Sequence, residues 1–208
     1  MPADAPGSVA GVVLAAGAST RMGRNKLLFR LGGETLIRRT VASALSAGLD
    51  PVIVVLGHEA ERAVTELAGL SIVPVFNPEY AHGINRSLKI GIASVPEDAS
   101  AAVVMLADMP MVTDRMVAAL VERFRTSRAP IVVSDYEGVQ APPTLYSRSV
   151  FAEVGALEGE GCGKQVVRRH APEVVKVSWP AGALTDVDRP EDYEGAKQRL
   201  GAGSADAS

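Results

Sequence analysis

A run of apolar residues, 9–14, passes directly into a loop rich in glycine and positive charge, A-A-G-A-S-T-R-M-G-R-N-K. The run is typical of a strand buried on both faces of a parallel sheet. Between residues 5 and 33 the chain carries no carboxylate, although its net charge is −3. The same stretch holds four basic residues, Arg21, Arg24, Lys26 and Arg30. This asymmetry predicts an anion site at the carboxyl end of a central strand.

The glycines of this loop, Gly17 and Gly23, tolerate positive φ and let backbone N–H groups approach a phosphate. Arg21 and Lys26 add charge-assisted hydrogen bonds. The spacing fits neither the Walker loop nor the G-x-G-x-x-G fingerprint, so the pattern favours neither a P-loop NTPase nor a dinucleotide-binding protein. A glycine-rich surface loop with solvated cations is the alternative.

Residues 14–28, L-A-A-G-A-S-T-R-M-G-R-N-K-L-L, resemble the signature L-A-A-G-x-S-x-R-M-G-x-x-K of nucleotidyltransferases. The resemblance is strongest to the molybdenum cofactor cytidylyltransferases. It implies that Arg21 and Lys26 act catalytically by neutralising a nucleoside triphosphate. The nucleotide-binding residues that it implies in this stretch are Leu14, Ala15, Ala16, Gly17 and Gly23.

The chain has 208 residues, 47% of them hydrophobic and 22% charged, and no apolar run near 18 residues. We expect a soluble single domain at residues 9–200, with a disordered lead at 1–8 and a disordered tail at 201–208. Because residues 1–8 lack a signal-peptide pattern, the expected location is cytoplasmic, without membrane contact. The pI of about 5.7 argues against a nucleic-acid partner. A single cysteine, Cys162, excludes an internal disulfide.

Strand-like and helix-like segments alternate along the chain, which predicts a Rossmann-like, doubly wound α/β fold. Its sheet is mostly parallel, with helices on both faces. The expected strands are residues 9–14, 51–56, 72–75, 101–106, 131–134 and 139–146, the last at an edge of the sheet. The expected helices are residues 34–47, 59–67, 84–95 and 114–125, followed by one entered from the loop at 157–163 and one that begins near Asp188.

An aspartate, Asp108, follows the predicted strand at 101–106 in the sequence A-D-M-P. A carboxylate at a strand tip is well placed to hold Mg²⁺, although Asp-x-Pro is also an ordinary turn. The resemblance favours the metal, because the family has G-D-M-P here and its aspartate is a catalytic metal ligand.

Near the end of the chain, T-D-V-D-R-P-E-D resembles the family's T-D-I-D-T-P-E-D, which contains a second metal ligand. Asp188 is our choice for that ligand and Asp186 the reserve. The structural alternative is a helix start, with Asp188 as the N-cap and Glu191 completing a capping box.

A third motif, N-P-E-Y-A-H-G-I-N-R-S-L, resembles the family's N-P-x-x-x-x-G-M-x-x-S-L and begins the helix expected at 84–95. The resemblance implies that Asn85 and Ser87 bind the nucleotide. An ordinary capped helix start is the alternative for Asn85.

Two further segments concern the acceptor substrate. Residues 157–170 resemble L-x-G-D-x-G-A-R-x-L-L, and Gly161, Gly163 and Lys164 are expected to bind an acceptor phosphate at a helix start. A flexible turn entering a helix is the alternative. At 139–146 the family has R-G-H-P-V-L-F, but Ala141 and Pro142 replace its Gly-His. This departure leaves the identity of the acceptor open.

The expected activity is a Mg²⁺-dependent nucleotidyl transfer, which moves CMP from CTP to the phosphate of a molybdopterin-type cofactor and releases pyrophosphate. A molybdenum hydroxylase is the expected recipient of the product. The alternatives are transfer to another phosphorylated small molecule, such as a sugar phosphate or phospholactate, and a non-catalytic chaperone that carries the cofactor.

Overall fold

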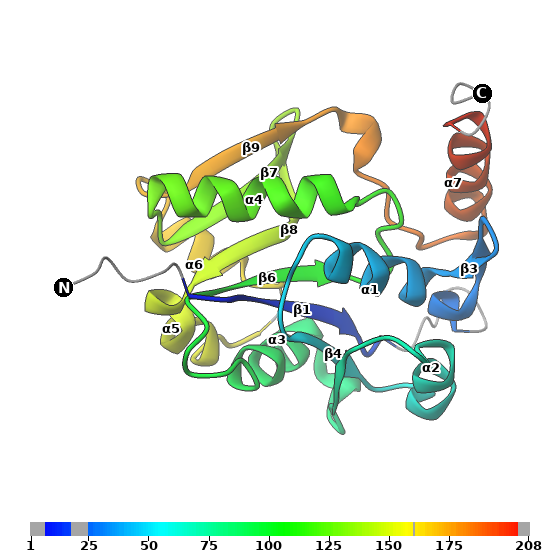
Figure 1. The fold of residues 1–208 in the computed structure, drawn as a ribbon, viewed down its shortest axis with the longest axis horizontal. Helices are drawn as coiled ribbons and strands as arrows, with labels where there is room; N and C mark the ends of the chain where they lie inside the picture. The colour runs from blue at the N-terminus through cyan, green and yellow to red at the C-terminus, as the bar shows by residue number, and fades with distance from the viewer. Residues whose placement is uncertain (1–6, 18–24, 160, 204–208) are drawn as a thin grey trace.

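The structure, a computed structural model, describes residues 7–17, 25–159 and 161–203. Its centre is a seven-stranded sheet in the order β5-β4-β1-β6-β8-β7-β9 (Figure 1). β8 runs antiparallel to both of its neighbours, and the other neighbouring strands of this sheet pair in parallel. The sheet is therefore mostly parallel, as the alternating sequence pattern predicts. The strands are β1 Val9–Ala15, β4 Val52–Leu56, β5 Val73–Phe76, β6 Ala101–Leu106, β7 Ile131–Tyr136, β8 Val139–Ser147 and β9 Val175–Trp179.

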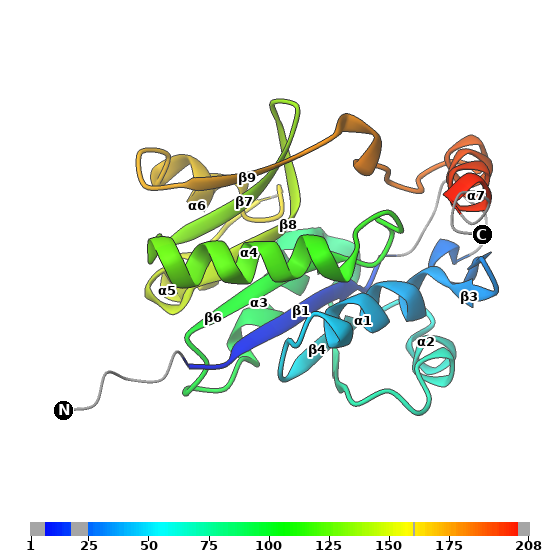
Figure 2. The same ribbon diagram turned by 45° about the horizontal axis from the view of Figure 1, so that its top comes forward.

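Side chains of β1 alternate between two hydrophobic cores, one on each face of the sheet. Val9 and Val13 enter the first core, and Val12 and Leu14 enter the second. The first face is covered by α1 Leu36–Ser46, α2 Ala60–Glu66 and α4 Asp114–Ser127, and the second by α3 Ile84–Ala93, α5 Phe151–Gly155 and α6 Lys164–Arg169. Figure 2 shows α1 and α4 in front of the sheet and α3 behind it. The two-sided arrangement confirms the doubly wound α/β fold.

Several helix boundaries follow from capping residues and glycines that can be recognised in the sequence. Thr113 caps α4, with its Oγ1 accepting a hydrogen bond from Met116 N at 3.3 Å. α1 ends before Gly48, which has φ of +77°, a conformation that favours glycine. α1 begins later than expected because Glu34–Thr35 forms β3, which pairs with β2 at Arg30–Leu31. Short 3-10 turns lie at Lys26–Leu28, Tyr80–His82, Arg148–Val150 and Ala181–Ala183.

One expectation about the sheet is corrected, and two elements were not predicted. β8 is not an edge strand, because it lies between β6 and β7 and pairs with both. The edges are β5 and β9, and the sequence pattern did not predict β9 or the short helix α5. β9 is partly exposed along its length, so it lacks the apolar run that reveals β1.

The last helix, α7 at Pro190–Gly203, lies at the right in Figure 1, apart from the two main cores. Leu31, Leu36, Val187 and Ala196 form a small third core, which we call the C-terminal cluster. This cluster fixes the segment before α7 against β2 and the start of α1. Among residues 7–17, 25–159 and 161–203, no helix has the length and apolar character that a membrane span requires.

An imidazole joins the end of α6 to α5. His170 Nε2 lies 2.8 Å from a Glu153 carboxylate oxygen, and its Nδ1 lies 3.4 Å from Glu173. The hydrogen bond with Glu153, helped by Glu173, raises the pKa of His170 above its ordinary value. A raised pKa means that the folded protein binds a proton more tightly than the unfolded chain.

We therefore expect the His170 pair to contribute its full stability below about pH 6, and to lose it as the pH rises through the folded-state pKa. The measurement is the free energy of unfolding of wild type and of His170→Gln between about pH 5 and pH 8. The difference should shrink with rising pH, and Glu153→Gln should abolish its pH dependence. A difference that is constant or grows with pH contradicts the assignment.

Candidate active site

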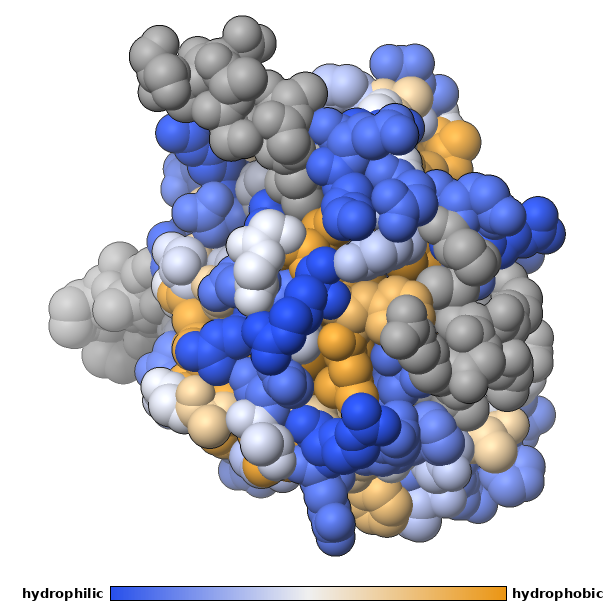
Figure 3. All heavy atoms as spheres, turned by 90° about the vertical axis from the view of Figure 1, so that its right-hand side faces the viewer, coloured by the Kyte–Doolittle hydropathy of each residue, from blue (hydrophilic) through white to orange (hydrophobic). Residues whose placement is uncertain are grey.

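The carboxyl ends of β1 and β6 form the centre of the candidate site. The two strands are neighbours, and Ala107 N donates to Leu14 O at 3.1 Å just where both end. The turn after β1 is also held from the other side, since His58 N donates to Ala16 O at 3.2 Å. These contacts bring the L-A-A-G turn and Asp108 to the same edge of the sheet. Figure 3 looks onto this end of the molecule, where hydrophobic groups lie in the centre of a mostly hydrophilic face.

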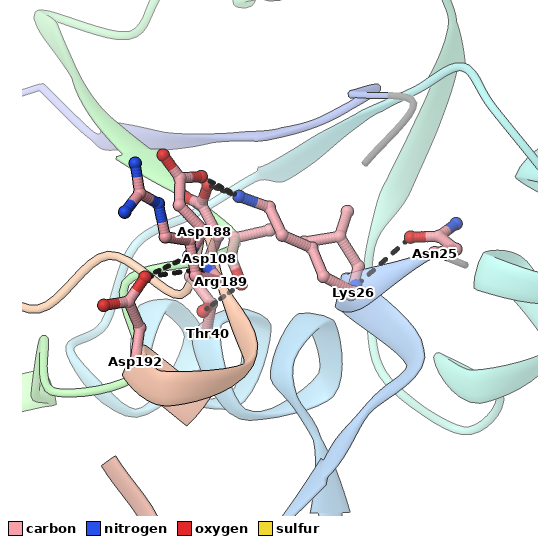
Figure 4. A network of polar contacts seen from close by, with 9 residues as sticks. Asn25, Lys26, Thr40, Asp108, Asp188, Arg189 and Asp192 are labelled. Carbon is pink, nitrogen blue, oxygen red and sulfur yellow. Dashed lines mark hydrogen bonds and ion pairs between the residues drawn. The ribbon is translucent and has the colours of Figure 1, made fainter. Parts of the chain in front are cut away.

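Lys26 bridges two aspartates that are distant in sequence. Its Nζ lies 2.7 Å from Asp108 Oδ2 and 2.6 Å from Asp188 Oδ1, and Figure 4 shows the three side chains converging. Burial by itself lowers the pKa of Lys26, but the two carboxylates outweigh burial and raise it above its ordinary value. The Lys26 side chain is 13% exposed, so this cation is largely shielded from solvent.

The position of Lys26 is set by the residue before it. Asn25 is buried, and its Oδ1 accepts a hydrogen bond from Leu27 N at 3.1 Å at the start of the 3-10 turn. Its Nδ2 donates to His58 O at 3.4 Å. Asn25 thus connects the Lys26 turn to the segment after β4. Asn25 was not predicted as a site residue. Its position directly before Lys26 in the motif could have indicated this role.

Asp188 reaches the site because its own segment is fixed at the backbone. Val187 N donates to Asp108 O at 3.0 Å, while the Val187 side chain is buried in the C-terminal cluster. The helix start is capped differently from the sequence expectation. Asp192 Oδ2, not Glu191, accepts hydrogen bonds from Asp188 N at 3.1 Å and from Arg189 N at 2.8 Å. The Asp188 carboxylate binds Lys26.

Asp186, the reserve ligand, lies close enough to Asp108 and Asp188 for their charges to shift its pKa. Its pKa is raised to about 6, first by burial and then by the negative charges of Asp108 and Asp188. Lys26 lowers the same pKa, so Asp186 lies within electrostatic reach of all three charged side chains.

The carboxylates of the site fit a cation whose remaining ligands come from the substrate and water. Asp108 and Asp188 present carboxylate oxygens, the ligand type that Mg²⁺ and Mn²⁺ favour. Within the described part of the chain, no three His, Cys, Asp or Glu side chains group into a ready-made metal site. Mg²⁺ in nucleotide enzymes is often held by one or two carboxylates together with phosphates and water. Two aspartates are compatible with that mode and not with an all-protein cage.

A cavity of about 320 Å³, which we call the β1 cavity, opens beside the Lys26 cluster. Of the predicted catalytic and nucleotide-binding residues, seven line it: Leu14, Ala15, Ala16, Gly17, Lys26, Ser87 and Asp108. Tyr80 and Gly83 also line it and were missed, although both stand in the N-P-E-Y-A-H-G motif. Gly17 does not have the positive φ that the sequence analysis allowed for it, and an added Cβ there would meet open space. Arg21 and Gly23 lie outside the described residues.

Asn85 does not line the β1 cavity. Its side chain is buried, with Nδ2 donating to Gly159 O at 2.9 Å and Oδ1 accepting from Gly163 N at 3.3 Å. The amide is thus occupied by the loop before α6. Asn85 therefore connects α3 to this loop. Ser87, in contrast, lines the β1 cavity and accepts a hydrogen bond from Asn77 Nδ2 at 2.9 Å.

A second cavity of about 310 Å³, the β8 cavity, lies between β8 and α6. Lys164 lines it, as do Ala141 and Pro142 from the segment that departs from the family. Gly161 and Gly163 do not line it, but they flank Cys162, which does. They have φ of +117° and +79°, and a Cβ on Gly163 would lie 2.3 Å from Tyr146 Oη.

Cys162 also lines the β8 cavity. Burial, followed by the charge of Asp108, raises the pKa of the Cys162 thiol to about 12. The thiol therefore stays protonated at neutral pH and is unsuited to act as a nucleophile.

The chain is similar to known proteins over most of its length. The family model of the MobA-like NTP transferase domain matches residues 11–174. The Purine catabolism protein PucB of Bacillus subtilis (strain 168) is 31% identical over 202 residues, which cover 91% of this chain and 96% of PucB.

Solved structures give the same result. The structure of Rv0371c from Mycobacterium tuberculosis H37Rv has a TM-score of 0.82 and 28% identity, covering 93% of this chain and 100% of that chain. Its homologue from Mycobacterium sp. strain JC1 has a TM-score of 0.80 and 34% identity, covering 93% and 97%. Rv0371c has also been solved in complex with manganese, with a TM-score of 0.76 and 27% identity, covering 92% and 98%. The family model and these relatives, together with the fold, show that the chain belongs to the MobA-like NTP transferase family and is a nucleotidyltransferase.

Proposed function

We propose that this nucleotidyltransferase moves CMP from CTP to the terminal phosphate of a molybdopterin-type cofactor, in the presence of Mg²⁺. The observation that carries the proposal is the position of Asp108. It binds Lys26 in the lining of the β1 cavity, and it stands just after β6, which pairs with β1 on one side and with β8 on the other. Both cavities are of the size that small molecules occupy. This supports a transfer between a nucleotide in the β1 cavity and an acceptor in the β8 cavity.

In the proposed reaction, an oxygen of the acceptor phosphate attacks the α-phosphorus of CTP. A new P–O bond forms, the bond to the bridging oxygen of the β-phosphate breaks, and pyrophosphate leaves. Such a transfer requires positioning and charge neutralisation more than a protein nucleophile. Mg²⁺, held by Asp108 and Asp188, supplies Lewis-acid polarisation of the phosphate when bound.

The residues of the chain have separate roles in this proposal. Lys26 neutralises negative charge on the triphosphate, and Arg21 is proposed for the same task from the resemblance. The turn Ala15–Ala16–Gly17 and Ser87 contact the nucleotide. Lys164 binds the acceptor phosphate. We propose that the reaction takes place in the cytoplasm and that a molybdenum hydroxylase receives the product.

The test is pyrophosphate release with CTP and Mg²⁺, measured across acceptors that include molybdopterin, a sugar 1-phosphate and phospholactate. Release that depends on molybdopterin supports the proposal, and release with another acceptor replaces it with that reaction. Tight molybdopterin binding without pyrophosphate release with any acceptor would indicate a carrier.

A nucleotide preference follows from the turn after β1. Ala16 is 5% exposed and lines the β1 cavity, whereas related guanylyltransferases carry L-A-G-G at this turn. The alanine methyl group reduces the space for a purine and restricts the backbone. We expect CTP to be preferred over GTP, and Ala16→Gly to shift the ratio of their kcat/KM values towards GTP by about 10-fold.

The matched control is Ala81→Gly, which removes a methyl group from another side of the same cavity. It should leave the CTP to GTP ratio near the wild-type value. If wild type uses GTP as well as CTP, or if both glycine variants behave alike, the turn does not select the base.

A further inference from the structure

β8 contains an irregularity at the wall of the β8 cavity. Val133 pairs with Thr144, but the next residue of β7, Ser134, pairs with Ala141. Pro142 and Pro143 therefore form a bulge without partners in the register of β7. Proline has no N–H group to donate to a neighbouring strand, so such a bulge is one of the few places that admit it inside a sheet.

Two hydroxyl groups of β7 satisfy the carbonyls of this bulge. Ser134 Oγ donates to Pro143 O at 2.8 Å, and Tyr136 Oη donates to Pro142 O at 2.9 Å. Ser134 is fully buried and Tyr136 is 1% exposed, so water does not replace these donors easily. A buried carbonyl that loses its hydrogen-bond partner destabilises the local structure, because it has also lost its contact with water. Burial raises the pKa of Tyr136 to about 12, so its hydroxyl remains a donor at neutral pH.

The bulge faces the cavity that the proposed function assigns to the acceptor. Pro142 and Ala141 line one side of the β8 cavity, and Lys164 and Arg168 of α6 line another. Lys164 and Arg168 are four residues apart and so lie on one face of the helix. An apolar wall opposite two cations suits an organic phosphomonoester, with its phosphate at α6 and its body against the bulge.

We propose that Ser134 and Tyr136 are positioning residues, whose hydroxyl groups hold the Pro142–Pro143 bulge in the shape that selects the acceptor. The inference rests on the proposed function for its choice of ligand. The two residues do not line the reacting centre, and they act through the carbonyls of the bulge. Their loss should therefore change how the acceptor binds and leave CTP binding intact.

Ser134→Ala and Tyr136→Phe each remove one hydroxyl group and little volume. The matched control is Tyr193→Phe, which removes a tyrosine hydroxyl that donates to the Arg30 carbonyl, away from the β8 cavity. The first measurement is hydrogen exchange of the backbone amides of residues 138–147, without any ligand. We expect faster exchange in Ser134→Ala and Tyr136→Phe and no change at these residues in Tyr193→Phe. Equal exchange in all four proteins overturns the proposal.

The second measurement is steady-state kinetics with CTP and molybdopterin, or with whichever acceptor of the panel releases pyrophosphate. We expect KM for the acceptor to rise roughly 5-fold or more in each β7 variant, with KM for CTP within about 2-fold of wild type. A merely structural role would lower the active fraction and leave both KM values unchanged.

The two measurements separate the possible failures. If wild type transfers nucleotide to none of the acceptors, the proposed function fails, while the exchange experiment still decides whether the hydroxyls hold the bulge. If wild type is active and exchange increases but KM for the acceptor does not, the bulge does not contact the acceptor and the specificity role is refuted.

Discussion

Asp108→Asn is expected to lower kcat by about 10²-fold or more, while the protein keeps its fold. The side chain is 22% exposed at the tip of β6, so it contributes to charge at the site and little to the core. Asparagine keeps the shape of the residue but removes the charge that binds Lys26 and that is proposed to bind the metal. The measurements are kcat from pyrophosphate release and the free energy of unfolding in denaturant.

Asp98→Asn is a suitable control, because it removes one carboxylate from an exposed turn on the same chain. It should leave kcat unchanged. Wild-type turnover in a well-folded Asp108→Asn protein contradicts a catalytic role for this residue.

Lys26→Met is expected to reduce kcat/KM for CTP by about 10²-fold, because it removes a shielded positive charge that we propose to face the triphosphate. Added salt should not reproduce this loss in wild type, since a contact inside a cavity is poorly screened. Lys26 Nζ also occupies the space between Asp108 and Asp188. In its absence a divalent cation binds these carboxylates without competition.

The second readout therefore uses binding alone. Mg²⁺ should raise the Tm of Lys26→Met more than that of wild type, because a ligand stabilises the folded state in proportion to its affinity. Lys89→Met, a change outside the β1 cavity lining, should behave as wild type in both measurements. Unchanged kinetics in Lys26→Met would contradict a catalytic role and leave Lys26 with only a structural role in its ion pairs with Asp108 and Asp188.

The central strands were predictable because burial on both faces leaves an unbroken apolar run, as at β1 and β6. β9 was missed because it has no unbroken apolar run. Its signal was the alternation of Val175, Val177 and Trp179 with polar residues, which is the pattern of a half-buried strand. β8 was predicted at an edge from the resemblance, as a strand that faces the acceptor. It is an interior strand, and the bulge at Pro142–Pro143 admits its prolines there. The bulge, and the hydroxyls of Ser134 and Tyr136 that donate to its carbonyls, are not recognisable without the register of β7 on β8.

The site residues, like the strands, were predictable only where the local sequence marks them. Strand tips are readable in sequence, so Asp108 and the turn at Ala15–Ala16 were found at one edge. Asn85 was assigned to the nucleotide because its neighbours in sequence pointed there. Its actual partners lie on the loop before α6, more than 70 residues away. Asp188 looked like part of a capping box with Glu191, but its carboxylate binds Lys26, and Asp192 takes the place predicted for Glu191.

The C-terminal cluster has a consequence for the order in which the molecule is completed. Asp188 is delivered by Val187, whose side chain packs with Leu31, Leu36 and Ala196. The ribosome makes this segment after all strands of the seven-stranded sheet. A nascent chain thus holds Lys26 and Asp108 long before it holds Asp188. We expect the nascent polypeptide to remain inactive until the segment around Val187 has left the exit tunnel and packed against Leu31 and Leu36, so that translation itself delays activity.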